Sequence, residues 1–183
     1  MELVKSLKSS KVIKYAFIAL IGSIALAISS KVKIPFYPVP MTMQTLVVIM
    51  IGAAFGWKLG LATVSLYLFE GIIGLPVFSG TPEKGLGLVY FTGPTMGYLI
   101  GFLVAVFLAG KFNYNKNLIT NFLKLTFATS FIYLLGIVWL GSLIGWDKPI
   151  FKLGAQPFLL AELFKLLIAT FAINQIIKIR NLI

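Results

Sequence analysis

The stretch from Met41 to Gly74 reads MTMQTLVVIMIGAAFGWKLGLATVSLYLFEGIIG and holds two apolar runs, 41–56 and 57–74. They meet at Gly56, followed by Trp57 and Lys58, which leaves room only for a tight turn. Since a membrane-spanning helix needs about 20 mostly apolar residues, the stretch predicts two spans that run in opposite directions.

The rest of the chain has the same character. Of its 183 residues, 59% are hydrophobic and 11% are charged, and the mean hydropathy is +0.99. A soluble domain is roughly half apolar and a quarter charged, so the excess apolar surface must face lipid. We therefore expect an all-α membrane protein, a single domain over 1–183. Its six transmembrane helices are expected at about 15–30, 41–56, 57–74, 94–110, 118–141 and 157–177.

Two boundaries of these spans depend on particular residues. Ala25-Leu26-Ala27 resembles a signal-peptide cleavage site, but further apolar runs follow, so we expect the first run to be a retained span. Pro94 suits the first turn of the fourth helix. The segments 31–40, 75–92, 111–117 and 142–156 are expected to be loops.

The basic residues set the expected orientation. The formal net charge is +11, and Arg180 is the sole arginine. Because the lysines lie between apolar runs, anionic lipid headgroups explain them better than nucleic acid. The positive-inside rule then places both termini in the cytoplasm. We expect the membrane to be the inner (plasma) membrane of a bacterial cell.

With that orientation, the strongly polar groups within the second, third, fourth and sixth spans all fall in the outer half of the membrane. They are Gln44, Glu70, Thr95, Tyr98, Glu162 and Lys165. An ionisable side chain at the bilayer centre costs about 3 kcal/mol or more and is a candidate functional group. Glu70 could instead reach headgroups, and Gln44 could link helices.

Glu162 and Lys165 are three residues apart and share one helix face. They could form a pocket in which Lys165 binds an anionic group and Glu162 accepts N–H bonds. They could equally form a structural ion pair, or Lys165 could extend outward to the membrane surface. Aromatic residues on the same side, including Phe78 and Tyr90, belong either to an interfacial belt or to a wall around an apolar ligand.

Small residues recur at a spacing of four in the first span: Ala19, Ser23 and Ala27. Such a stripe lets helices approach closely. It either packs the bundle or docks a helix of a partner protein.

The chain lacks the usual signatures of catalysis. It has no Cys and no His, and Gly80 to Gly85 has the spacing of a phosphate-binding loop without the Lys-Ser/Thr that follows one. We therefore expect no enzyme activity, no ATPase of its own, no metal and no cofactor.

Four motifs resemble the BioY family, the biotin-specific substrate-binding components of energy-coupling-factor transporters. In order along the chain they are VPMTMQT from Val39 to Thr45, LYLFEG from Leu66 to Gly71, GLPVF from Gly74 to Phe78, and GPTMGY from Gly93 to Tyr98. The family's last helix carries Asp-x-x-Lys, whereas this chain has Glu162-Leu163-Phe164-Lys165, an acid longer by one methylene.

The resemblance implies six helices around an outward biotin pocket, with a lid that includes Pro35, Phe36 and Tyr37. It also implies partners, a transmembrane coupling protein and two ATPases, docked on the small residues of the first helix. Some family members are thought to work without them.

Biotin would place its carboxylate on Lys165, its ureido group on Gln44 and Glu162, and its thioether ring against aromatic residues. Three residues complete the expected pocket beside Phe78: Thr42, Tyr90 and Tyr98. The alternatives are binding of another vitamin, and a small membrane enzyme that acts on lipid with Glu162 and Lys165 as an acid–base pair.

Overall fold

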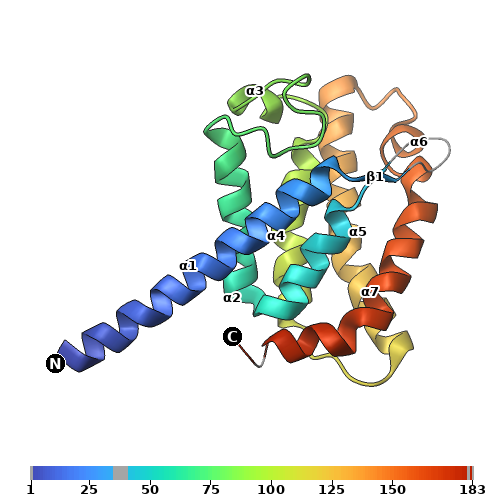
Figure 1. Cartoon of the computed structure of the whole chain (residues 1–183). Helices are drawn as coiled ribbons and strands as arrows, with labels where there is room; N and C mark the ends of the chain where they lie inside the picture. Colours follow the sequence, from blue (N-terminus) through green and yellow to red (C-terminus); the bar gives the residue numbers. More distant parts are fainter. Residues whose placement is uncertain (1, 35–40, 181, 183) are drawn as a thin grey trace.

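Long helices packed side by side make up most of the molecule (Figure 1). The structure is a computed structural model and describes residues 2–34, 41–180 and 182. The long helices are α1 (Glu2–Lys31), α2 (Gln44–Ile72), α4 (Met96–Lys111), α5 (Leu118–Ile144) and α7 (Leu159–Arg180). The short elements are β1 (Lys33–Ile34), β2 (Met41–Thr42), α3 (Leu88–Phe91), α6 (Ile150–Gly154) and the 3₁₀ turn η1 (Gln156–Phe158).

Helix α2 is a hairpin of two helical arms rather than one rod. Gly56 has φ 73° and ψ 171°, values outside the helical region, and the chain reverses there. The side chain of Gln44 at the start of one arm bonds to that of Tyr67 near the end of the other. The tight turn expected at Gly56 is thus confirmed, and glycine permits it because it has no Cβ to strain at positive φ.

The hairpin lies at the centre of the bundle, where it contacts α1, α4 and α7. Glycines bring the helices close: a Cβ on Gly52 would lie 2.6 Å from the carbonyl oxygen of Val106, and one on Gly101 would collide with Ile132. Small residues at helix crossings allow such approach in membrane proteins.

Outward-facing apolar side chains fit a membrane setting. Phe17, Ile24 and Phe171 are among the large hydrophobic residues left exposed. By length and composition, four helical stretches of the described residues could cross a membrane: Lys11–Lys31, Gln44–Ile72, Leu118–Ile144 and Ile150–Arg180. The stretch Gln44–Ile72 is one of these four, although it contains both arms of the hairpin. At 1.5 Å per residue, the arm 44–55 alone rises only about 18 Å, so it is too short to be counted as a separate span by length.

Some expected boundaries were wrong. Pro94 precedes α4 instead of lying in its first turn, because helical bonding starts where Tyr98 and Leu99 donate to the Thr95 carbonyl. Two expected loops contain short helices, α3 and α6. Pro157 lies in η1 rather than in α7.

The small-residue stripe of α1 faces the bundle. Ala19 and Ser23 are buried and Ala27 packs against the core. Ser23 donates a hydrogen bond of 2.9 Å to Glu70 of α2. The burial of Ala19 and Ser23 favours the alternative in which the stripe packs the bundle, whereas Ala27 is only half-buried. Docking of a partner helix on the stripe stays a prediction.

Candidate functional site

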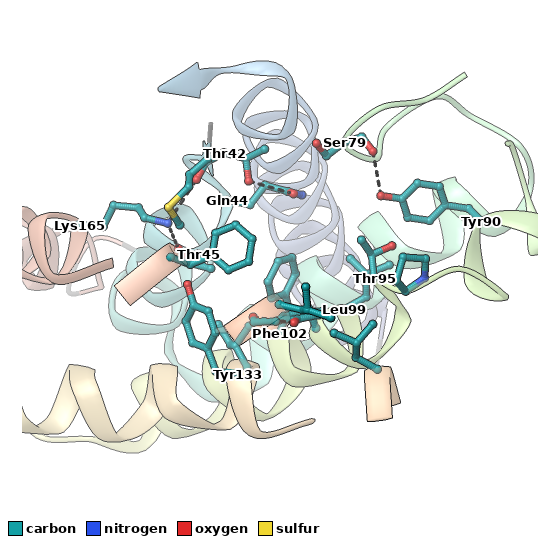
Figure 2. A pocket seen from close by; sticks show the side chains of 18 of the residues that line it. Thr42, Gln44, Thr45, Ser79, Tyr90, Thr95, Leu99, Phe102, Tyr133 and Lys165 are labelled. Carbon is teal, nitrogen blue, oxygen red and sulfur yellow. Dashed lines mark hydrogen bonds between the residues drawn. The ribbon is translucent and has the colours of Figure 1, made fainter. Parts of the chain in front are cut away.

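A cavity of about 450 Å³ opens between α2, α4, α5 and α7, at the end of the bundle where β1, α3 and α6 lie (Figure 1). Its walls are mostly apolar, with a few polar side chains that point inward (Figure 2). The lining residues are Met41, Thr42, Gln44, Thr45, Ser79, Tyr90, Pro94, Thr95, Tyr98, Leu99, Phe102, Ile132, Tyr133, Leu140, Ile144, Leu153, Gly154, Phe158 and Lys165.

An ion-pair cluster of Lys165, Glu162, Thr45 and Tyr133 forms one wall. Lys165 Nζ lies 2.8 Å from Glu162 Oε2 and donates to Thr45 Oγ1 at 2.7 Å. Thr45 donates in turn to Glu162 Oε2 at 2.9 Å, and the Tyr133 hydroxyl donates to the same oxygen at 2.8 Å. Lys165 is 2% exposed and Glu162 is 4% exposed. Burial of both charges is tolerable only because they are paired and hydrogen-bonded.

The cluster joins three helices, since Thr45 comes from α2, Tyr133 from α5 and the charged pair from α7. The third contact of Lys165 Nζ is the Thr42 carbonyl at 3.3 Å, the longest of its three contacts. Both Thr42 and Lys165 line the cavity, so this longest contact is the one that an incoming anion could replace. The other carboxylate oxygen, Glu162 Oε1, is buried without a hydrogen-bond partner in the described part of the chain.

Gln44, the first residue of α2, also lines the cavity. Its Nε2 donates to the Tyr67 hydroxyl at 2.6 Å, and that hydroxyl donates to the Val77 carbonyl at 3.1 Å. Within the described residues, Gln44 Oε1 accepts a single hydrogen bond, a long one of 3.5 Å from the Thr42 hydroxyl. It therefore keeps capacity to accept a stronger bond from a ligand N–H.

Tyr90 lines the opposite side of the cavity (Figure 2), and Phe78 and Tyr67 pack behind it to complete an aromatic cluster. Phe78 stacks on Tyr90 with ring centres 4.7 Å apart and packs edge-on against Tyr67 at 5.3 Å. Burial raises the pKa of Tyr90, so its hydroxyl stays protonated and donates to the Ser79 carbonyl at 2.9 Å. Gly71 is required beneath Phe78, because a Cβ there would collide with the ring.

Comparison of the sequence with models of known protein families assigns the chain to a family. The model described as the BioY family matches residues 4–181. The chain belongs to the BioY family. With several long apolar helices, it is a multi-pass membrane protein.

Relatives in this family are named as transporters. A probable biotin transporter BioY of Pyrococcus horikoshii is 34% identical over 76% of this chain and 81% of its own length. Biotin transporter BioY2 of Lactococcus lactis subsp. cremoris is 30% identical over 90% of each chain. In fold, the chain is similar to a crystal structure titled as the S-component for biotin from an ECF-type ABC transporter. The TM-score is 0.75 and the identity 24%, over 92% of this chain and 93% of that one.

In this BioY family chain, the residues expected at the site fall in two layers. Five of them line the cavity: Thr42, Gln44, Tyr90, Tyr98 and Lys165. Glu162 and Phe78 stand behind the lining, where they hold Lys165 and Tyr90 respectively. Glu70 is not at the cavity but bonds to α1. The lid residues Pro35, Phe36 and Tyr37 lie outside the described residues.

Sequence reasoning missed Thr45 and Tyr133, which line the cavity, and Tyr67, which stands behind the lining and accepts a hydrogen bond from Gln44. A hydroxyl-bearing ring within an apolar run was the available signal for Tyr67 and Tyr133. Tyr98 has the same signal and was expected; its hydroxyl donates to the Gly154 carbonyl at 2.7 Å, which fixes the segment before α7.

Proposed function

We propose that this chain captures biotin from outside the cell as the substrate-binding component of an energy-coupling-factor transporter. The observation that carries the proposal is a lysine whose ammonium reaches a largely apolar cavity of about 450 Å³, a size typical of small-molecule sites. The family membership and the names of the relatives support biotin as the ligand.

In the proposed complex, the biotin carboxylate binds Lys165 and replaces its 3.3 Å contact with the Thr42 carbonyl. Glu162 keeps the ammonium in place from behind and does not touch the ligand, which revises the contact expected from the sequence. A ureido N–H donates to the under-used Gln44 Oε1. The thioether ring packs against Tyr90 and Phe102, which line the cavity.

We further propose that the chain crosses the membrane six times, with both termini in the cytoplasm. The two arms of α2 and helix α4 are then short spans beside α1, α5 and α7. Reporter fusions after Lys33 and after Arg180 should report opposite sides of the plasma membrane. The same side for both fusions would rule out six crossings.

The energy for uptake must come from elsewhere, because the sequence contains no phosphate-binding loop. A transmembrane coupling protein and two ATPases are the proposed partners. Docking of the coupling protein along the α1 stripe of Ala19, Ser23 and Ala27 stays part of this proposal.

Calorimetry on the purified protein tests the function. Biotin should bind tightly, whereas biotin methyl ester should bind at least about tenfold more weakly, because a charge-assisted hydrogen bond contributes about 1.5–3 kcal/mol. Thiamin and riboflavin, offered at the same concentration, should not compete. Preferential binding of another vitamin, or turnover of a lipid by the protein alone, would replace the proposal.

A further inference from the structure

A second cavity, of about 520 Å³, lies at the opposite end of the bundle from the first. It is formed by α1, the turn of α2 and the end of α7, which come together near the C-terminus (Figure 1). Its lining combines aromatic and basic side chains: Tyr15, Phe55, Gly56, Trp57, Lys58, Leu59, Ala62 and Arg180.

The two cations of this cavity lack acidic partners. In the described part of the chain, no acidic side chain pairs with Lys58 or Arg180, and the sequence has no acid between Glu2 and Glu70 or after Glu162. Lys58 Nζ instead lies 5.4 Å from the ring centre of Trp57. Lys111 lies over the same ring at 5.6 Å and adds a third positive charge nearby. Among the described residues, the cavity therefore carries positive charge that no acidic side chain neutralises, which would favour an anionic ligand.

The turn at Gly56 lets the guanidinium of Arg180 lie against the backbone. A Cβ on Gly56 would be 3.3 Å from the Arg180 side-chain nitrogens, in tight contact. A guanidinium held in this way presents its remaining N–H groups as a planar fork, the geometry that matches two phosphate oxygens.

We propose that this second cavity binds one anionic phospholipid. Arg180 and Lys58 hold the headgroup phosphate, and the glycerol and acyl chains lie on Tyr15 and Phe55. A lipid fits better than free phosphate because the wall is aromatic and continues into the exposed apolar face of α1, which includes Val12, Ile13 and Phe17. The basic residues would lie at the depth of the headgroups.

Native mass spectrometry tests the proposal on the full chain, with phosphatidylglycerol and phosphatidylcholine offered in equal amounts. Phosphatidylglycerol should be retained in clear preference. The double variant Lys58→Gln with Arg180→Gln should lower its affinity by about fivefold for each cation removed, close to the level of phosphatidylcholine. The matched control, Lys84→Gln with Lys152→Gln, removes two exposed charges at the other end and should leave retention unchanged.

Inorganic phosphate added in millimolar excess tests whether the cavity binds a lipid headgroup or free phosphate. It should neither displace phosphatidylglycerol nor raise the melting temperature of the parent as the lipid does; if it does either, the lipid assignment is wrong. Equal retention of both lipids by the parent would also overturn the proposal, and this measurement needs no variant to fold. Unchanged biotin binding in the double variant would show that the first cavity is intact, so the two sites are tested separately.

Discussion

The two walls of the first cavity are built in different ways. The ion-pair cluster ties three long helices together through charges that are almost completely buried. The aromatic cluster joins the α2 hairpin to the segment 75–92 through the Tyr67–Phe78 ring contact and the neutral hydrogen bond from Tyr67 to the Val77 carbonyl. A charged wall can fix the position of a ligand charge, whereas the aromatic wall supplies surface. Changes in the first should therefore affect affinity more than changes in the second.

The largest effect is expected from Glu162→Gln combined with Lys165→Met. Removing both charges leaves no uncompensated buried ion, so the fold should survive. Biotin affinity should nevertheless fall by about 100-fold, since a charge-assisted bond to the carboxylate is lost. Calorimetry measures the affinity, and Lys152→Met, exposed at the same end, is the control. Affinity within about threefold of the parent would show that Lys165 does not hold the ligand.

Next comes Tyr133→Phe, which removes one donor from Glu162 Oε2. Hydrogen bonds to charged groups contribute about 1.5–3 kcal/mol, and a looser carboxylate positions Lys165 less well, so biotin affinity should fall about tenfold. Tyr98→Phe is the matched variant, because its hydroxyl bonds to a neutral carbonyl. If Tyr98→Phe lowers biotin affinity as much as Tyr133→Phe does, the ion-pair cluster does not contribute more to affinity than the neutral contacts.

Phe78→Leu should mainly lower stability. It removes the stacked contact with Tyr90 and the edge contacts with Tyr67 and Phe91, and each aromatic pair contributes about 0.5–1.5 kcal/mol. We expect a loss of about 1.5–4.5 kcal/mol of stability, seen as a lower melting temperature, with biotin affinity reduced by a few fold at most. Phe171→Leu, on the exposed face of α7, should leave the melting temperature nearly unchanged. A larger loss of affinity than in Tyr133→Phe would reverse the ranking of the two walls.

The smallest effect is expected from Tyr90→Phe. The ring stays in place and only the bond to the Ser79 carbonyl is lost, a neutral hydrogen bond that contributes about 0.5–1.5 kcal/mol. Biotin affinity should fall about threefold by calorimetry. Thr92→Val removes an exposed hydroxyl in the same segment and should have no effect. A tenfold or greater loss in Tyr90→Phe would mean that its hydroxyl contacts the ligand directly.

Much of the fold could be predicted because membrane helices are apolar throughout. The runs 118–141 and 157–177 lie largely within α5 and α7, and Gly56 marks the reversal of the hairpin. Boundaries were less predictable where hydrogen bonds within a loop decide them, as at Pro94. Short helices such as α3 have too few residues to give a periodic signal.

The sequence by itself determined that Glu162 and Lys165 share a helix face, because a spacing of three does so in any α-helix. It also determined the helical, membrane-embedded character of the chain through its composition. Only the tertiary structure decided which polar groups from other helices complete the pair, since Thr45 and Tyr133 are distant in sequence. It likewise decided that Ala19 and Ser23 are buried, because the neighbours of a helix face are set by packing between segments and not by the pattern within one.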